Sequence, residues 1–286
     1  MSVVDDSFGD PLKVEEKATM ILAGGIAGQG YQCGMLWGAA LAAGAQAYRV
    51  YGSDSQAEAA ALIASQKVVE SFRTQSRNEI NCLEITEMNF QGENQVLPIL
   101  KFFLKGGPIG CFGMAARYAP LAYREIDAAL SEGNFAVPSP PVSCTTMVAK
   151  KMGASKIHAV MAAGLAGGIG LSGGACGALG TAIWFRAMGR TEETVGLNFT
   201  ASWIDKIIKR FVESSDYKFE CSEIVGRKFE SIHDHAEYIC KGGCSNIIDT
   251  LAAQRSGYTK NLTPAPPDRR VRAAIYPFSP LLVLVL

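Results

Sequence analysis

Hydrophobic spacing along the chain predicts a protein built mainly of helices. Apolar residues recur at helical spacing, or the composition favours helix, in residues 56–75, 118–130, 143–166, 177–188, 199–214 and 245–254. β-Branched residues do not alternate with polar ones over any long stretch, as a half-buried strand would require. The pattern therefore predicts a mainly α fold without a central sheet.

The sequence contains an internal repeat. Sliding the chain along itself until Gly24 meets Gly167 aligns two segments with the pattern G-G-I-x3-G-x2-C-G, whose cysteines are Cys33 and Cys176. A second pattern, F-x9-C-x-E-I-x4-F, aligns after a small change of offset and contains Cys82 and Cys221. Both blocks are free of gaps and keep the same order, which indicates a duplication. We expect the two copies of this helical unit to pack as a pseudo-dimer.

The repeat and the composition together predict the domain organisation. The first copy spans residues 1–130, and the second, with the fuller set of cysteines, spans residues 143–257. Residues 131–142 are rich in Pro and Gly and are expected to form a linker. Residues 258–286 are rich in Pro and Arg with no amphipathic period, so we expect an extended or disordered tail.

The eight cysteines divide unequally between the copies. The first copy has Cys33, Cys82 and Cys111, and the second has Cys144, Cys176, Cys221, Cys240 and Cys244. In the alignment that pairs Cys33 with Cys176, the position equivalent to Cys144 is Met1. The first copy is therefore expected to lack the leading cysteine.

Charge and termini limit the classes of function. Lys plus Arg balances Asp plus Glu at 27 each, so no net positive field favours nucleic acid. The first residues are acidic and do not resemble a secretory signal, so we expect a cytoplasmic or other reducing compartment. Eight cysteines are too few for a disulfide scaffold at this length. In such a compartment cysteines bind metal, carry out redox chemistry or are simply buried.

Two long segments carry no charge, and each is long enough to cross a bilayer. They are residues 18–48 and 159–185, and both are rich in Gly and Ala with few large aliphatic side chains. Small residues at this density also permit close helix packing in a protein interior. We expect these segments to pack within the fold and not to insert into a membrane.

The glycine-rich segment 167–174 leads into a helix that begins near Cys176. Glycines allow a sharp backbone turn, and the exposed N–H groups at a helix start stabilise a thiolate. We therefore expect Cys33 and Cys176 within one turn of helix N-termini, as candidates for metal or redox chemistry. The alternative is a helix hairpin packed through small residues, with each cysteine buried as a small hydrophobic side chain.

Other motifs give weaker signals. Residues 168–173 match a dinucleotide fingerprint, but no strand precedes them, so no nucleotide is expected. His233, His235, Cys240 and Cys244 are zinc-ligand types without the spacing of a structural zinc site, and we expect both histidines at the surface. The chain lacks a C-x-x-C-H motif for covalent haem and any recognisable hydrolase arrangement.

Four cysteines of the second copy carry a family resemblance. Cys144, the A-C-G-A-L-G segment around Cys176, then Cys221 and Cys244 follow the order of a redox-active family named for its pattern C, G-C-A-x-x-G, C, C. The resemblance covers residues 143–255 and departs from the pattern by exchanging Ala and Gly around the central cysteine. The first copy resembles the family less closely, and whether it holds a complete site is left open.

The resemblance implies a function. A similar domain forms part of split-Soret cytochrome c, where the cysteines are associated with an iron–sulfur cluster. It implies electron transfer through a cysteine-ligated iron–sulfur centre, or thiol/disulfide chemistry, with a redox partner protein or larger complex, and it allows an oligomer. Cys144, Cys176, Cys221 and Cys244 would be the metal ligands, with Cys240 the alternative to Cys244. Two other functions stay open, namely a non-catalytic structural subunit that retains the fold and an enzyme with a lone nucleophilic thiolate.

Overall fold

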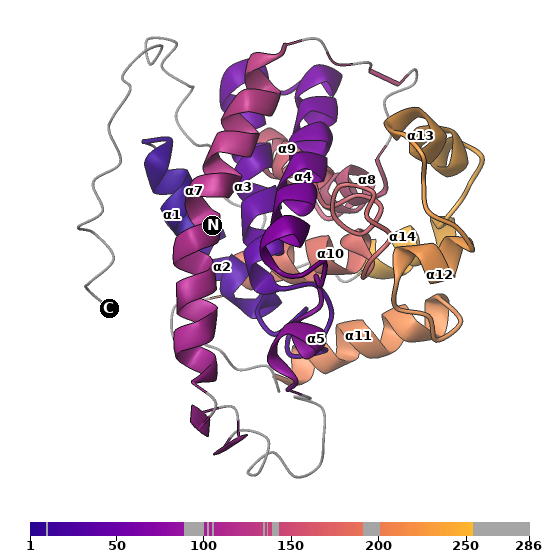
Figure 1. Cartoon of the computed structure of the whole chain (residues 1–286). Coiled ribbons are helices and arrows are strands. Elements are labelled where there is room, and N and C mark those ends of the chain that lie inside the picture. The colour runs from indigo at the N-terminus through magenta and orange to yellow at the C-terminus, as the bar shows by residue number, and fades with distance from the viewer. Residues whose placement is uncertain are drawn as a thin grey trace.

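The computed structural model describes residues 1–9, 11–88, 100–101, 103–104, 106–133, 135, 137–138, 143–190 and 201–253. The first copy contains α1 (Ser2–Ser7), α2 (Lys13–Thr19), the 3₁₀ turn η1 (Met20–Leu22), α3 (Gly34–Tyr51), α4 (Ser55–Gln75), α5 (Cys82–Thr86) and α7 (Gly107–Ser131) (Figure 1). The second contains α8 (Cys144–Lys151), α9 (Lys156–Ala163), α10 (Gly177–Met188), α11 (Ser202–Ser214), α12 (Cys221–Val225), α13 (Ile232–Cys240) and α14 (Ser245–Ala252). Extended pairing in the described residues is limited to two isolated bridges, so the mainly α prediction is confirmed.

The helices predicted from the sequence agree with the structure in some segments and differ in others. Residues 177–188 form α10 and residues 56–75 lie within α4, as predicted. The predicted helix 143–166 is wrong, because Gly153 with φ 89° separates α8 from α9. The start of α3 after Cys33 was predicted, but its extent to Tyr51 was not. The expected tail 258–286 lies outside the described residues, as does part of the linker 131–142.

The backbone repeats in the two copies. Helices α1, α2 and α3 correspond to α8, α9 and α10 in the alignment of Cys33 with Cys176, and α4 and α5 correspond to α11 and α12 in that of Cys82 with Cys221. The turn that follows η1 has positive φ at residues 24–28 and 30, and the same six positions in the second copy, 167–171 and 173, also have positive φ. The duplication therefore extends to individual backbone angles.

This left-handed turn is held by the same hydrogen bonds in both copies. Ala27 N–H donates to the Ile21 carbonyl at 2.9 Å, and Gly170 N–H donates to the Gly164 carbonyl at 3.0 Å. A left-handed residue other than glycine costs about 1–2 kcal/mol, which explains why glycines fill most of the turn. Ile26 and its equivalent Ile169 adopt φ near 60° and are fully buried, so their apolar burial offsets that strain.

Residues at equivalent positions meet between the copies, as expected at a two-fold axis. Glu15 in α2 and His158 in α9 occupy equivalent positions of the repeat, and their side chains form a hydrogen bond of 2.7 Å. The Gln32 side chain accepts a hydrogen bond of 2.8 Å from the N–H of Ala175, which is its own equivalent in the second copy. The two copies therefore pack as a pseudo-dimer around these pairs.

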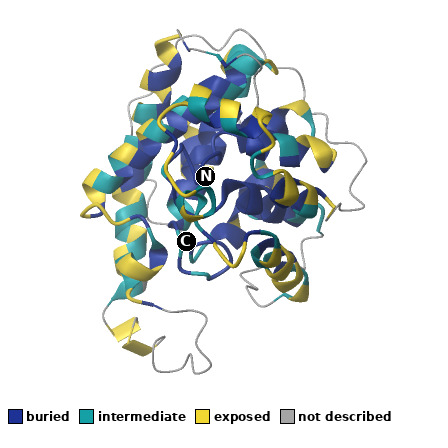
Figure 2. Cartoon of the chain, turned by 90° about the vertical axis from the view of Figure 1, so that its right-hand side faces the viewer, coloured by how far each residue is buried: buried dark blue, intermediate teal, exposed yellow. Residues whose placement is uncertain are grey.

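Buried residues of both copies form one core in the middle of the molecule (Figure 2). Helix α3 packs between α4 of its own copy and α9 of the second copy, and α10 packs on α2 in the equivalent way. Gly44 allows the close approach of α3 and α9, because a Cβ there would overlap the backbone of Met161. The two uncharged segments 18–48 and 159–185 thus supply much of the shared interior.

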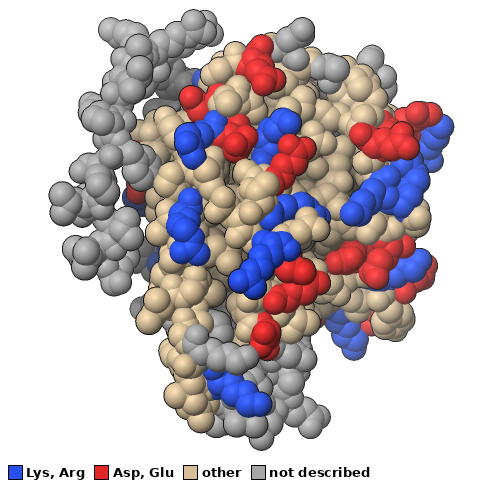
Figure 3. All heavy atoms as spheres, in the orientation of Figure 1, with Lys and Arg blue, Asp and Glu red and all other residues tan. Residues whose placement is uncertain are grey.

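Charged groups of both signs are mixed over the face shown in Figure 3. Lys150 pairs with Glu58 at 2.8 Å between the two copies, and Arg227 pairs with Asp234 at 2.6 Å within the second. Of the helices that the structure describes, none is long and apolar enough to cross a membrane.

Candidate functional site

One cavity in the second copy is lined by four cysteines. Cys144 is the first residue of α8, Cys176 precedes α10, Cys221 is the first residue of α12, and Cys244 precedes α14. The empty volume of the cavity, including its opening to solvent, is about 360 Å³. Apolar side chains, among them Ile224, Phe229, Ile239 and Ile247, complete its wall together with His235. Four distant parts of the sequence therefore contribute thiols to one apolar space.

Backbone hydrogen bonds hold two of these cysteines side by side. The N–H of Cys176 donates to the Phe219 carbonyl at 3.0 Å, and the N–H of Cys221 donates to the Gly174 carbonyl at 2.7 Å. These bonds surround the isolated bridge between Ala175 and Glu220. Each cysteine then begins a helix, or lies just before one, so the bridge fixes both helix starts at the cavity.

The other two cysteines enter through helix packing. Helix α8 packs on α10 and α14, which brings Cys144 and Cys244 to the same cavity. Cys244 has a left-handed backbone with φ 58°, which lets the chain turn sharply after Gly243 and start α14. The four cysteines therefore depend on contacts among three helices and are not held by a single loop.

Burial makes all four thiols hard to ionise. It raises the pKa of Cys176 to about 12 and holds the pKa values of Cys144 and Cys221 higher still. The negative charge of a neighbouring thiolate raises the pKa of a thiol further. Every pair among these four cysteines interacts in this way. Four thiolates lining one apolar cavity would need compensating positive charge, which a bound metal supplies.

The expected positions of Cys33 and Cys176 before helices are confirmed, but the expected thiolate stabilisation is not. Each is the N-cap residue of its helix, α3 or α10. Backbone N–H groups of Leu179 and Ala178 hydrogen-bond to the Cys176 sulfur and lower its pKa, yet the desolvation of the buried thiol outweighs them. The helix start alone therefore leaves this sulfur protonated at neutral pH.

His235 is buried, so the expectation that both histidines lie at the surface is wrong for this residue. Its side chain packs edge-on against Phe229, with ring centroids 4.9 Å apart, and its Nε2 lies 3.4 Å from the Cys144 sulfur. Burial lowers the pKa of His235 to about 4, so the imidazole is neutral at pH 7. His233, two residues earlier, is exposed, so the expectation is confirmed for that residue.

Cys240 takes no part in the cavity. It is the last residue of α13 and is exposed, whereas Cys244 starts the next helix after a turn. Cys240 and Cys244 therefore do not lie on one helix, and the structure does not support Cys240 as the alternative to Cys244. Cys244, and not Cys240, lines the cavity.

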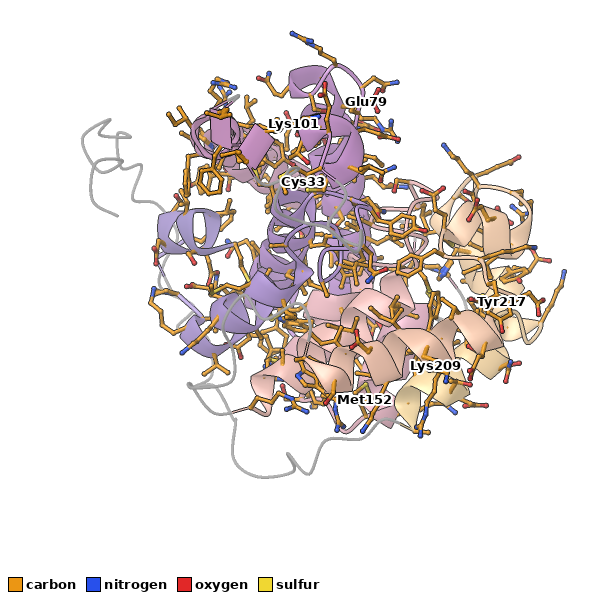
Figure 4. All side chains as sticks on the ribbon, turned by 90° about the horizontal axis from the view of Figure 1, so that it is seen from below. Cys33, Glu79, Lys101, Met152, Lys209 and Tyr217 are labelled. Atoms are coloured by element: carbon orange, nitrogen blue, oxygen red, sulfur yellow. The ribbon has the colours of Figure 1, made fainter. Side chains whose placement is uncertain are left out.

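The first copy brings its three cysteines together on a similar arrangement of helices. Cys33 precedes α3, Cys82 begins α5, and Cys111 lies in the second turn of α7. Burial raises the pKa of all three, that of Cys33 to about 12, and the charges of Cys82 and Cys111 raise it further. Figure 4 shows Cys33 in the interior of the first copy, whereas Tyr217 projects from the edge of the second. In the alignment of the two copies, Met1 stands at the position equivalent to Cys144.

The donor set of the second copy suits a cluster better than a single ion. Within the described residues, no group of three or more His, Cys, Asp or Glu side chains is placed to hold one metal ion. An iron–sulfur cluster carries its own sulfides, spaces its cysteine ligands more widely and takes thiolate donors. The residues present therefore fit such a cluster.

The sequence contained a signal for the additional residues of the site. His235 and Ile239 lie four residues apart after Ser231, whose side chain caps α13 by accepting from the Asp234 N–H. That spacing indicates a helix with one inward face. The zinc-type ligand pattern drew attention to the histidines, but it did not show which of them pointed inward.

Comparison with known protein families supports the division of the chain into two copies. The family model described as "Putative redox-active protein (C_GCAxxG_C_C)" matches residues 1–118 and, separately, residues 142–255. No curated protein and no solved structure matches the chain. The two matched segments cover most of the sequence and correspond to the two copies of the fold. The chain therefore belongs to this redox-active family, with one copy of the family's domain in each half.

Proposed function

We propose that the protein transfers electrons through an iron–sulfur cluster held by Cys144, Cys176, Cys221 and Cys244. The observation that carries this proposal is that these four thiols, from four separate elements, line one cavity. Cysteines buried only for packing would not need to converge on a shared space. A cluster ligated by cysteine requires such convergence.

The surroundings of the thiols support the same function. Backbone N–H groups of Gly167 and Ala178 hydrogen-bond to the sulfurs of Cys144 and Cys176. Such bonds stabilise charge on sulfur and tune reduction potentials. The apolar wall that includes Ile224 and Phe229 limits access of water to the thiols. When bound, the cluster would supply one-electron chemistry, while this chain provides ligands, hydrogen bonds and a mainly apolar surrounding.

The test is to purify the protein without oxygen and to measure iron, acid-labile sulfide and visible absorption per chain. We expect iron and sulfide in the wild type and their loss in Cys176→Ser. The matched control is Cys240→Ser, because this exposed cysteine of the same copy lies outside the cavity. This control should keep the wild-type iron content.

Two outcomes would contradict the proposal. A metal-free protein in which two of the four thiols form a disulfide reversibly would favour thiol/disulfide chemistry. A metal-free protein whose thiols stay reduced under mild oxidants would favour a structural subunit that retains the fold of the family.

A further inference from the structure

Helix α13 presents two polar side chains to the sulfurs of the cavity. His235 and Tyr238 are three residues apart, which places them on the same face of the helix. The Nε2 atom of His235 lies 3.4 Å from the sulfur of Cys144. The hydroxyl of Tyr238 hydrogen-bonds to the thiol of Cys244. One helix therefore reaches two of the four cysteines.

The two ring nitrogens of His235 have different environments. The residue is 1 % exposed, and its Nδ1 has no hydrogen-bond partner among the described residues, while Nε2 faces the Cys144 sulfur. A buried N–H without an acceptor is costly, whereas the same proton on Nε2 finds a sulfur acceptor. The neutral imidazole is therefore expected to carry its proton on Nε2 and to donate it to Cys144.

Tyr238 is held in place by the chain that follows it. Its ring lies against Gly243, where any Cβ would overlap the ring carbons. Gly243 immediately precedes Cys244, so the residue that makes room for the ring also positions the acceptor of its hydrogen bond. A tyrosine hydroxyl donates readily to a thiolate, and this bond lowers the pKa of Cys244 against the larger effect of burial.

We propose that α13 sets the reduction potential of the centre, with His235 and Tyr238 as positioning residues that donate hydrogen bonds to Cys144 and Cys244. This inference rests on the proposed function. Reduction adds negative charge to the cluster and its sulfur ligands, and donors to sulfur stabilise that charge. The two side chains therefore raise the potential. The first copy contains no histidine, so its thiols lack the equivalent of the His235 contact.

The test compares the reduction potentials of Tyr238→Phe, His235→Leu and the double variant with that of the wild-type protein, all loaded with iron. Tyr238→Phe removes only a hydroxyl and should fold normally. We expect wild-type iron content in each variant, a more negative potential in both single variants and the most negative in the double variant. His235→Gln, which retains a side-chain N–H, should recover part of the shift. The matched control is His233→Leu, a histidine of the same helix outside the cavity lining, which should not change the potential.

A second readout requires no metal. Proton–nitrogen correlation spectra of the metal-free protein report which ring nitrogen of His235 carries the proton, and we expect Nε2. A proton on Nδ1, or unchanged potentials in Tyr238→Phe and His235→Leu, would overturn the inference while leaving the proposed function intact. Loss of iron in both His235→Leu and His235→Gln would make His235 a ligand and would also overturn it. A wild-type protein without iron would instead contradict the proposed function, and the spectra would still decide whether the His235 hydrogen bond exists.

Discussion

The two copies share one backbone frame but surround different sets of side chains. Both have the left-handed turn, the bridge that follows it and a cysteine before the next helix. The second copy adds Cys144 and His235, whereas the first has Met1 at the position of Cys144 and no histidine. The comparison shows that the frame can gather thiols in either copy, while the identity of a few side chains decides whether a four-thiol site is complete.

The copies also differ in their side chains at the surface where they meet. In a true homodimer identical residues would face each other across the axis, but here equivalent positions hold complementary residues. Glu15 faces His158 at 2.7 Å, and Trp37 packs on Gly180, where a Cβ would overlap the indole ring. Two tryptophans or two glutamates would not fit these places. Fusion in one chain allows each copy to specialise.

The largest expected effect comes from breaking the buried pair at the axis. His158→Leu leaves the Glu15 carboxylate buried without its hydrogen-bond partner, which should destabilise the protein by about 3–5 kcal/mol. Urea unfolding measures this loss. The control is Lys241→Met, which removes an exposed ion pair with Glu237 and should change stability by less than about 1 kcal/mol. A loss no larger than that of the control would show that the axis pair is not important for stability.

A smaller loss of stability is expected when alanine replaces either glycine that follows a helix-start cysteine, and the loss should differ between the two copies. A Cβ at Gly177 would overlap the carbonyl oxygen of Leu165, whereas a Cβ at the equivalent Gly34 would lie 2.9 Å from the Ala23 Cα. We expect Gly177→Ala to destabilise the protein by about 3 kcal/mol and Gly34→Ala by about 1 kcal/mol, since overpacking typically costs about 1–3 kcal/mol. Equal losses in the unfolding curves would mean that the two turns are equally tight.

The left-handed turn offers a subtler comparison, because Ala27 and Gly170 occupy equivalent positions. Gly170→Ala would place a Cβ 2.6 Å from the Gln66 nitrogen and should cost about 2 kcal/mol. Ala27→Gly removes left-handed strain but also loses a buried methyl group, so its net effect should be within about 1 kcal/mol. Thermal unfolding of both variants would test this, and a large loss in Ala27→Gly would contradict it.

The smallest expected effect is a dependence of stability on pH. Burial alone would raise the pKa of Glu15, but the hydrogen bond from His158 and further favourable interactions lower it below its ordinary value of 4.5. The stability that this carboxylate contributes is therefore present above pH 4.5 and is lost as the pH falls through the lower pKa of the folded state. Melting temperatures of wild type and Glu15→Gln should converge in acid. A constant difference between them down to about pH 3 would exclude this linkage.

The sequence supported predictions that depend on local pattern. The gapless blocks around Cys33 and Cys176 predicted the repeat, and the glycines before them predicted a sharp turn ahead of a helix. The order Cys144, Cys176, Cys221 and Cys244 selected the four cysteines that line the cavity. Such features follow from spacing and backbone preference, which the sequence records directly.

Features that depend on packing between distant segments could not be predicted. The burial of His235 depends on how α13 lies against Phe229, and the pair of Glu15 and His158 forms only once the copies associate. The thiol pKa values likewise depend on the depth of burial, which reverses the effect expected from a helix start.

The most direct test of the central claim is a crystal structure of the protein purified without oxygen, with diffraction recorded on both sides of the iron absorption edge. The account predicts anomalous density for iron in the second copy, bounded by the sulfurs of Cys144, Cys176, Cys221 and Cys244, and none among Cys33, Cys82 and Cys111 of the first. Iron bound only among the three cysteines of the first copy, or an iron-free cavity in the second, would contradict it.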